Sequence, residues 1–286
     1  MKLCRFVTPN QQTHIGTISD DGLVHDLTGT GIESIGQVLN AQSPADELRK
    51  ALARTHTTFK LGDVRFASPV DRQEIWAAGV TYLRSKKARM EESDFSASAY
   101  DRVYDAPRPE IFFKSNPDKS IPTGEAVGIR SDAKWNVPEP ELALVMNRQG
   151  QVVGYTIGND MSSRDIEGEN LLYLPQAKTY HRSCGLGPWI VLGPSESEVR
   201  NWTITLKISR QQTTVFTGET RIDQIKRSFP ELAGYLFRCQ RFDHGAVLLT
   251  GTGIVPADDF TLASGDVVSI SISGIGTLEN PVEIVN

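Results

Sequence analysis

Cysteine is scarce and scattered in this sequence. Only Cys4, Cys184 and Cys239 occur in 286 residues, an odd number at wide spacings. A disulfide framework needs paired cysteines and a thiolate metal site needs closely spaced ones, so neither is expected. Unpaired thiols fit a reducing compartment, and we predict a cytoplasmic protein.

Long apolar runs are also missing. No stretch approaches the roughly 18 consecutive apolar residues that a membrane-spanning helix requires. The first residues include Lys2 and Arg5, but no apolar segment of the kind found in a secretory signal peptide follows them. We therefore expect neither a membrane span nor export.

Basic clusters are absent as well. The formal net charge is −5, and no run of Lys and Arg could follow a phosphate backbone, so a nucleic-acid partner is not expected. The sequence contains neither the G-x-G-x-x-G pattern nor the P-loop pattern of nucleotide-binding proteins. Its proportions of hydrophobic residues (39%) and charged residues (23%) are those of an ordinary folded soluble protein.

The sequence pattern divides the chain into two unequal parts. Residues 1–68 are predicted to form a small N-terminal α/β domain, with β-prone runs at 3–7, 15–19 and 23–27 and a helix over about 44–54. Residues 69–286 form the larger part, in which short strands alternate with turn residues and only a few helices intervene. This mixture predicts an α+β fold and not a doubly wound parallel sheet.

A polar segment lies early in the larger part, over residues 85–107. It could form two helices, over 86–92 and 97–104, or a mobile flap over a site, because loops of this length are often functional. The sequence leaves both interpretations open.

Two glutamates and an aspartate stand out on a predicted hairpin. Side chains alternate along a strand, so Glu139 and Glu141 lie on the same face. A polar turn over 147–151 leads into a returning strand. If the turn centres between residues 149 and 150, then Glu139 lies opposite Asp160 and Glu141 lies opposite Gly158. A slip of one residue would turn Asp160 to the other face.

Such a hairpin brings three carboxylates together. Converging carboxylates raise one another's pKa values unless a cation joins them. Oxygen ligands suit Mg²⁺, Mn²⁺ or Ca²⁺, so Glu139, Glu141 and Asp160 are the predicted metal ligands. The alternative is three solvated acids on an exposed hairpin.

These residues resemble the metal signature of the fumarylacetoacetate hydrolase family, E-x-E followed by N-D-x-[ST]-[AS]-R-D. The two motifs here are Glu139-Pro-Glu141 and Asn159-Asp160-Met161-Ser162-Ser163-Arg164-Asp165. The resemblance covers most of residues 75–286. It extends to the segments at 109–114, 187–189 and 249–253 and to Lys178.

The strings RPEIFFK, VPEPELALV, ENLLYLPQAK and GTGIVP resemble members of that family that dehydrate 2-keto-3-deoxy sugar acids, such as 2-keto-3-deoxy-D-arabinonate. The resemblance implies a fumarylacetoacetate-hydrolase-like mixed β-roll over residues 69–286 and dependence on a Mg²⁺-type ion. It also implies a small 2-keto acid substrate, 2,5-dioxopentanoate as the product, and a homo-oligomer.

One departure from the family pattern bears on the reaction. The family's C–C bond hydrolases carry a water-activating histidine shortly after a Gly-x-x-Tyr segment. Here residues 83–87 follow Gly79-Val-Thr-Tyr82 and contain no histidine. This absence favours an elimination. A C–C bond hydrolase, decarboxylase or isomerase acting on an acylpyruvate-like 2-keto acid remains the alternative, as does a non-catalytic binding protein.

The resemblance also implies roles for individual residues. Glu110, in an apolar strand, is the expected general acid or base, unless it only forms an ion pair with Lys114 or Arg108. Lys178 is expected to steady an enolate or carry a proton, and Arg164 to orient the acidic cluster. The expected substrate contacts are Lys114, Thr252, Ser85 and Tyr82.

Overall fold

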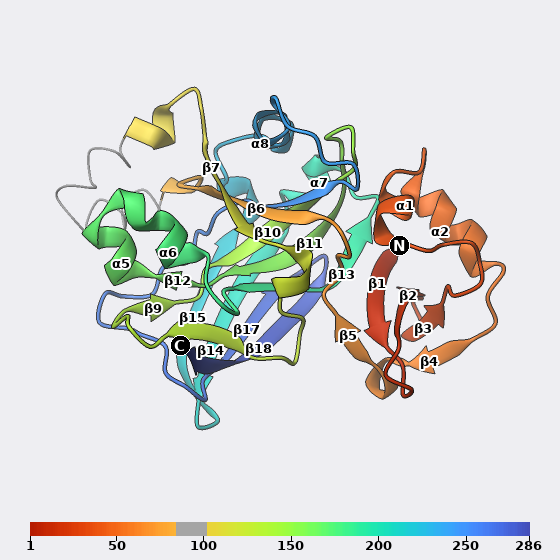
Figure 1. The fold of residues 1–286 in the computed structure, drawn as a ribbon, viewed down its shortest axis with the longest axis horizontal. Coiled ribbons are helices and arrows are strands. Elements are labelled where there is room, and N and C mark those ends of the chain that lie inside the picture. The colour runs from red at the N-terminus through yellow and green to blue at the C-terminus, as the bar shows by residue number, and fades with distance from the viewer. Residues whose placement is uncertain (84–101) are drawn as a thin grey trace.

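A large mixed sheet of eleven strands forms the frame of the molecule. The computed structural model describes residues 1–83 and 102–286. The strand order is β4-β3-β2-β1-β13-β11-β10-β16-β6-β7, with β5 paired to β1 (Figure 1). These strands are β1 (Lys2–Val7), β2 (Thr13–Ile18), β3 (Leu23–Asp26), β4 (Thr58–Lys60), β5 (Arg65–Ala67), β6 (Glu74–Gly79), β7 (Glu110–Ser115), β10 (Pro140–Met146), β11 (Val152–Asp160), β13 (Cys184–Leu192) and β16 (Ala246–Leu249).

A second sheet of five strands faces part of the first. Its order is β15-β14-β17-β18-β8, and a two-stranded ribbon, β12 with β9, lies nearby. The strands are β8 (Val127–Arg130), β9 (Asn136–Val137), β12 (Ser162–Ser163), β14 (Thr203–Arg210), β15 (Thr213–Arg221), β17 (Val267–Ile272) and β18 (Gly276–Val285). Strand residues dominate the described chain, which confirms the predicted α+β class.

The helices are short and lie around the sheets (Figure 1). The α-helices include α1 (Ile35–Leu39), α2 (Pro44–Leu52), α5 (Arg164–Glu169), α6 (Leu174–Lys178), α7 (Glu196–Val199) and α8 (Phe229–Leu236), and the 3-10 helices include η1 (Leu61–Asp63), η2 (Pro117–Lys119), η3 (Leu171–Tyr173) and η4 (Ile222–Gln224). In the described part of the chain, no helix has the length and apolar character needed to cross a bilayer.

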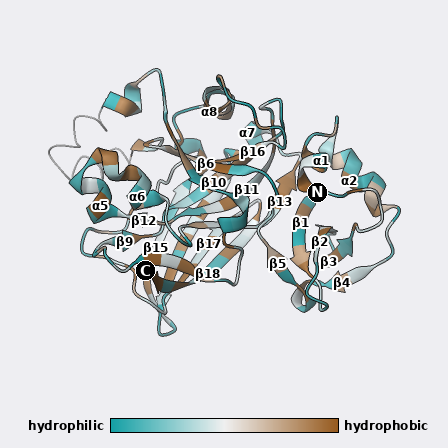
Figure 2. Cartoon of the chain, viewed as in Figure 1, coloured by the Kyte–Doolittle hydropathy of each residue, from teal (hydrophilic) through white to brown (hydrophobic). Residues whose placement is uncertain are grey.

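Strand β10 separates two hydrophobic cores. Leu142, Leu144 and Met146 enter the core that β14, β17 and α8 also line. Ala143 and Val145 enter the core on the opposite face, with side chains from α1 and α2. Figure 2 shows hydrophobic residues along the strands of both sheets. Because β10 is covered on both faces, truncation of a buried leucine in it should cost about 2–5 kcal/mol.

The N-terminal strands join the same large sheet as the rest of the chain. Residues 2 and 3 of β1 pair with residues 191 and 190 of β13. The three predicted N-terminal strands are confirmed as β1, β2 and β3, and the predicted helix as α2. The predicted division into residues 1–68 and 69–286 stays a prediction. The helices or flap expected over residues 85–107 fall largely outside the described residues.

Candidate metal centre and active-site pocket

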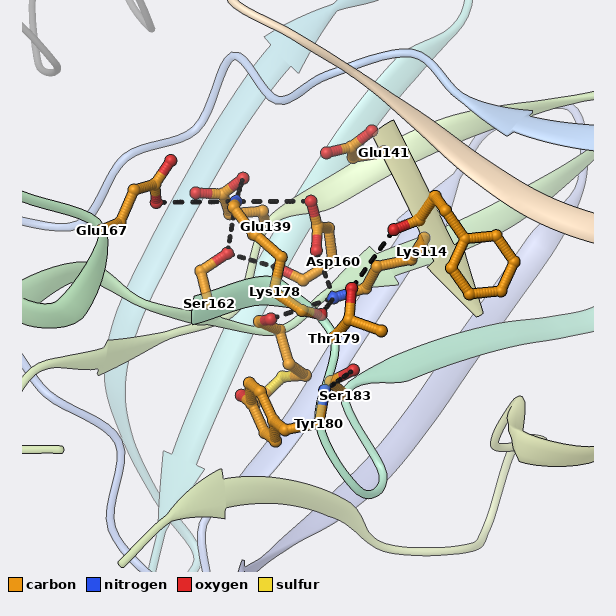
Figure 3. Close-up of polar contacts among 12 residues, drawn as sticks. Lys114, Glu139, Glu141, Asp160, Ser162, Glu167, Lys178, Thr179, Tyr180 and Ser183 are labelled. Carbon is orange, nitrogen blue, oxygen red and sulfur yellow. Dashed lines mark hydrogen bonds and ion pairs between the residues drawn. The ribbon is translucent and has the colours of Figure 1, made fainter. Parts of the chain in front are cut away.

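Three carboxylates meet at one end of the β10–β11 hairpin. Glu139 immediately precedes β10, Glu141 is its second residue, and Asp160 is the last residue of β11. One oxygen from each carboxylate lies within 4.8 Å of the other two. The three residues are only 4%, 1% and 1% exposed, and Figure 3 shows them around a common space. The predicted convergence is confirmed, because these are not solvated acids.

The hairpin register explains the convergence. Glu141 pairs with Gly158, and the Asp160 N–H donates to the Glu139 carbonyl at 3.0 Å, as the predicted pairing requires. A bulge after Val145 shifts the pairing by one residue near the turn. A Cβ added to Gly158 would lie 2.1 Å from the Leu249 side chain. Glycine at this position therefore makes room for the packed side chain of Leu249.

The prolines beside the glutamates are compatible with this interior strand. Pro140 begins β10, which lies between β11 and β16 in the sheet. The β16 pairing covers only residues 143–146 of β10. The start of β10 therefore extends beyond its neighbour, and the missing proline N–H interrupts no hydrogen bond to β16.

Two cations lie against the Glu139 carboxylate. Lys178 Nζ is 2.8 Å from Glu139 Oε2 and 3.3 Å from Asp160 Oδ2. Arg164 Nη2 donates to Glu139 Oε1 at 3.0 Å. Lys178 and Arg164 are both 2% exposed, so water and salt screen these ion pairs little. Arg164 thus lies where a residue that orients the acidic cluster would be expected.

The remaining acidic charge fits a divalent cation. Burial and the nearby carboxylates of Asp160 and Glu139 raise the pKa of Glu141 well above its ordinary value, although the Gly251 N–H donates to Glu141 Oε2 at 2.5 Å. Counted as ionised, the carboxylates of the pocket outnumber the neighbouring cations by two. The carboxylates are Glu110, Glu139, Glu141, Asp160 and Glu167, and the cations are Lys114, Arg164 and Lys178. A hard, oxygen-seeking dication suits both this donor set and this charge.

A small cavity of about 20 Å³ lies beside the three carboxylates. This volume accommodates a single ion or water molecule. The backbone of Val80, at its edge, has a φ of 52°, which is unusual for a β-branched residue. The described residues that line the cavity are Ala78, Gly79, Val80, Glu110, Phe112, Glu139, Glu141, Asp160, Glu167, Leu174, Lys178, Gly251 and Thr252.

Glu110 reaches this cavity across a glycine. It begins β7 and pairs with Gly79 at the end of β6. A Cβ added to Gly79 would lie 2.0 Å from Glu110 Oε2. The glycine therefore leaves the space in which the Glu110 carboxylate lies. The predicted acid/base residue faces the same cavity as the metal-binding cluster.

Thr252 reaches the cavity from a tight turn after β16. Its hydroxyl donates to the Ile254 carbonyl at 3.2 Å and accepts from the Ile254 N–H at the same distance. The preceding Gly251 has a φ of 88°, and a Cβ there would lie 2.3 Å from Thr81 Oγ1. The turn therefore requires glycine. It presents Thr252 to the cavity, although the Thr252 hydroxyl is used within the turn.

Two other predicted substrate contacts, Tyr82 and Lys114, do not line the described part of this cavity. Tyr82 is 1% exposed and packs in the core beside Gly253, and its burial raises the pKa of its hydroxyl. Lys114 is fully buried and is also absent from the described lining residues. Ser85 lies outside the described residues. The roles given to these three residues stay predictions.

Sequence reasoning missed two side chains that contact Lys178. Ser162 Oγ accepts a hydrogen bond from Lys178 Nζ at 2.6 Å, and Glu167 Oε2 lies 3.9 Å from the same atom (Figure 3). Glu167 follows Arg164 by three residues on α5. The two therefore share a helix face, and this spacing was the available signal. Ser162 occupies the [ST] position of the N-D-x-[ST]-[AS]-R-D motif, and this position was the signal that could have identified it.

Comparison with known proteins matches most of this chain to a described family. Residues 74–283 match the family described as "Fumarylacetoacetate (FAA) hydrolase C-terminal". The chain is 43% identical over 269 residues to "Probable 2-keto-3-deoxyxylonate dehydratase" of Haloferax volcanii, covering 94% of this chain and 89% of that protein. It is 42% identical over 229 residues to "2-dehydro-3-deoxy-D-arabinonate dehydratase" of Saccharolobus solfataricus, covering 79% and 77%.

A solved structure resembles the whole chain. It is described as 2-keto-3-deoxy-D-arabinonate dehydratase complexed with magnesium and 2,5-dioxopentanoate. The match has a TM-score of 0.84 and 36% identity, and it covers 100% of both chains. The similarity therefore includes the N-terminal residues that precede the family match.

Proposed function

The chain belongs to the fumarylacetoacetate hydrolase family, and from that premise we propose that it is a divalent-metal-dependent dehydratase of a 2-keto-3-deoxy sugar acid. The expected product is 2,5-dioxopentanoate, formed from a five-carbon substrate with loss of one water. One observation supports this proposal above the others. The buried carboxylate trio, Lys178 and the Glu110 carboxylate all face one cavity.

The ligands of the cation follow from the donor set. Glu139, Glu141 and Asp160 would hold a Mg²⁺-type ion, and Mn²⁺ and Ca²⁺ have the same preference for oxygen. When bound, the ion supplies Lewis acidity toward the oxygens of a 2-keto acid. Arg164 keeps the Glu139 carboxylate in place through its 3.0 Å hydrogen bond. The magnesium in the similar solved structure supports this assignment.

Glu110 is suited to proton transfer at carbon. Dehydration breaks a C3–H bond and the C4–O bond, so a base must accept the C3 proton and an acid must protonate the departing hydroxyl. The resulting C3–C4 alkene then tautomerises: C5 loses a proton and C3 gains one to give an enol, which becomes the C5 aldehyde. Glu110 faces the cavity from β7, and its carboxylate lies over Gly79. We assign the C3 proton to Glu110.

Lys178 is suited to stabilising the charge that develops. Its ammonium faces the cavity and lies among the oxygens of Glu139, Asp160 and Ser162. A fixed cation there lowers the energy of an enolate without reorganisation. Lys178 also carries protons that could leave with the C4 hydroxyl. Thr252, at the cavity edge, is proposed to contact the substrate carboxylate.

The two relatives are named for a 2-keto-3-deoxyxylonate and a 2-dehydro-3-deoxy-D-arabinonate, and these two names can describe one compound. In a 2-keto-3-deoxypentonate, C2 is a ketone and C3 is a methylene, so C4 is the single remaining stereocentre. Acids derived from xylonate and arabinonate therefore become the same compound when their C4 configurations agree. We propose a five-carbon acid of this kind as the substrate.

We further propose that the protein works in the cytoplasm as a homo-oligomer. Its three cysteines are free, and burial raises the pKa of the Cys184 thiol to about 12. Unpaired thiols fit a reducing compartment. The family resemblance supports the oligomer, and light scattering coupled to size-exclusion chromatography would determine its size.

The decisive experiment is a substrate panel with Mg²⁺. The panel contains both C4 enantiomers of 2-keto-3-deoxypentonate, a six-carbon homologue, an acylpyruvate and oxaloacetate. We expect semialdehyde from one five-carbon enantiomer and none in chelator. Pyruvate released from the acylpyruvate, without semialdehyde from any sugar acid, would establish a C–C bond hydrolase instead. Ligand binding without turnover of any compound would establish a binding protein.

A further inference from the structure

Lys114 is a second lysine beside the metal-binding cluster, but it lies on the opposite side from Lys178. It is the fifth residue of β7 and is 0% exposed. Its Nζ lies 2.5 Å from Asp160 Oδ1 and donates to the Met161 carbonyl at 3.1 Å and to the Lys178 carbonyl. Figure 3 shows this ammonium below Asp160.

Three protein oxygens surround the Lys114 ammonium. The Met161 and Lys178 carbonyls accept hydrogen bonds from it, and Asp160 Oδ1 is its ion-pair partner. Burying an unpaired cation is costly, so the side chain is held where these oxygens are. Lys114 does not line the described part of the cavity, whereas Lys178 does. A substrate contact would require Lys114 to abandon its partners.

The contacts of Lys114 divide the Asp160 carboxylate into two differently placed oxygens. Lys114 takes Oδ1. The other oxygen, Oδ2, lies on the side of Lys178, whose ammonium also contacts Glu139. Oδ2 is therefore the Asp160 oxygen that faces the rest of the carboxylate cluster.

Lys114 also joins three chain segments. Met161 follows the end of β11, and Lys178 ends α6, so one ammonium on β7 connects both of these ends. The backbone of Lys178 is thereby fixed relative to Asp160. A side chain acting through two neighbours in this way affects the site without touching a reacting atom.

We propose that Lys114 is a positioning residue that holds Asp160 Oδ1, so that Asp160 offers only Oδ2 to the cation, and that fixes the backbone of Lys178. The proposal replaces the substrate-binding role that the sequence suggested. It rests on the proposed metal dependence but not on the identity of the substrate. Outer partners of metal ligands typically change metal affinity or activity by about 10–100-fold when they are removed.

The test compares Lys114→Met with Lys114→Arg and with Lys119→Met, a control in η2. Methionine keeps most of the side-chain volume but no charge, and arginine keeps the charge. Mn²⁺ affinity is measured by electron paramagnetic resonance, and kcat and KM are measured at saturating Mn²⁺. For Lys114→Met we expect Mn²⁺ affinity and kcat each to fall about 10–100-fold with an unchanged KM. Lys114→Arg should recover part of the affinity, and the control should match the wild type.

Several results would overturn the proposal. A higher KM with unchanged Mn²⁺ affinity would show a substrate contact, and tighter Mn²⁺ binding would show that Lys114 is only a competing charge. If the methionine variant fails to fold, the wild-type crystal structure with Mn²⁺ decides. Lys114 should remain on Oδ1 with the ion on Oδ2, and an ion bound through both oxygens contradicts the inference. Mn²⁺ binding is measured without substrate, so failure of the dehydratase assignment would be seen separately in the substrate panel.

Discussion

At the scale of single residues, the proposed site uses carboxylates in two roles: three bind the cation, and Glu110 transfers a proton. Glu110 comes from β7, which pairs with β6 and not with the β10–β11 hairpin that carries the cation ligands. It nevertheless faces the same cavity as they do. This separation makes its contribution experimentally distinct from metal binding.

We predict that Glu110→Gln lowers kcat about 10²–10⁴-fold, the usual contribution of a general acid or base. Mn²⁺ affinity and the melting temperature should change little, because the amide keeps the shape of the side chain. The matched control is Glu219→Gln, on the exposed strand β15, which should leave kcat unchanged. A variant with full turnover would exclude Glu110 from proton transfer.

Glu141 makes cation binding dependent on pH. Burial and its two carboxylate neighbours raise its pKa in the folded, metal-free protein. A proton therefore occupies Glu141 at pH values where an ordinary glutamate is ionised, and the cation must displace it. Mg²⁺ affinity should rise as the pH rises above about 4.5 and through the raised pKa, with proton release on binding.

The same shift affects folding stability. Because the pKa of Glu141 is raised in the folded protein, its contribution to the free energy of unfolding is fully present below the unfolded-state pKa. That contribution is lost as the pH rises through the folded-state pKa. The predicted proton release on cation binding is measured by calorimetric titration of Mg²⁺ in buffers of different ionisation enthalpy. Binding without proton release at any pH would contradict a shifted Glu141.

Residue-level prediction succeeded where the contacts were local. The cluster of Glu139, Glu141 and Asp160 followed from one hairpin register. The oxygens around Lys114 belong to Asp160 at the end of β11, to Met161 just after it, and to Lys178 at the end of α6. Two of them are backbone carbonyls, which no side-chain pattern reveals, so sequence reasoning could not distinguish a positioning lysine from a substrate contact.

At the scale of elements, the end of β6 determines where Glu110 can lie. We predict that Gly79→Ala displaces the Glu110 carboxylate, because the new Cβ would lie 2.0 Å from Oε2. The clash involves the flexible end of a side chain, so stability should change little. The value of kcat should fall roughly 10²-fold, as a misplacement of about 1 Å can cause.

The control for this prediction is Gly234→Ala in α8. A Cβ there meets no atom within 4 Å, and alanine favours a helix over glycine by roughly 0.5–1 kcal/mol. This variant should be as active as the wild type and slightly more stable, as measured by denaturant unfolding. Equal kcat values for the two alanine variants would refute the role of Gly79.

Element positions were predictable from periodicity, but their neighbours were not. The alternation in β10 indicated two faces, and both faces are buried. That β10 lies between β11 and β16 depends on a pairing with residues about 100 positions away. Local patterns contain no information about such a distant partner.

At the scale of the whole molecule, the N-terminal part supports the rest. Strand β1 pairs with β13, and side chains of α1 and α2 complete one of the two cores. We predict that residues 69–286 expressed alone are insoluble or poorly folded, because an edge of β13 and an apolar surface become exposed. Soluble yield and circular dichroism test this. A folded fragment would show that residues 69–286 fold independently of residues 1–68.

Cation binding should stabilise the entire fold. Because Mg²⁺ relieves repulsion within a buried cluster, saturation at 100 times Kd should add about 2.7 kcal/mol. At roughly 2–4 °C per kcal/mol, the melting temperature should rise about 5–10 °C in differential scanning calorimetry. Glu139→Gln and Asp160→Asn should remove this shift and abolish turnover. An equal shift in these variants would place the ion elsewhere.

The two-sided burial of β10 has an evolutionary consequence. Consecutive residues of this strand enter different cores, and Glu139 and Glu141 follow the same alternation at its start. Losing or gaining one codon within it would exchange both cores and reverse the acidic groups at once. Relatives should therefore vary here by replacement alone, while length changes accumulate in the Asn147–Gln151 turn.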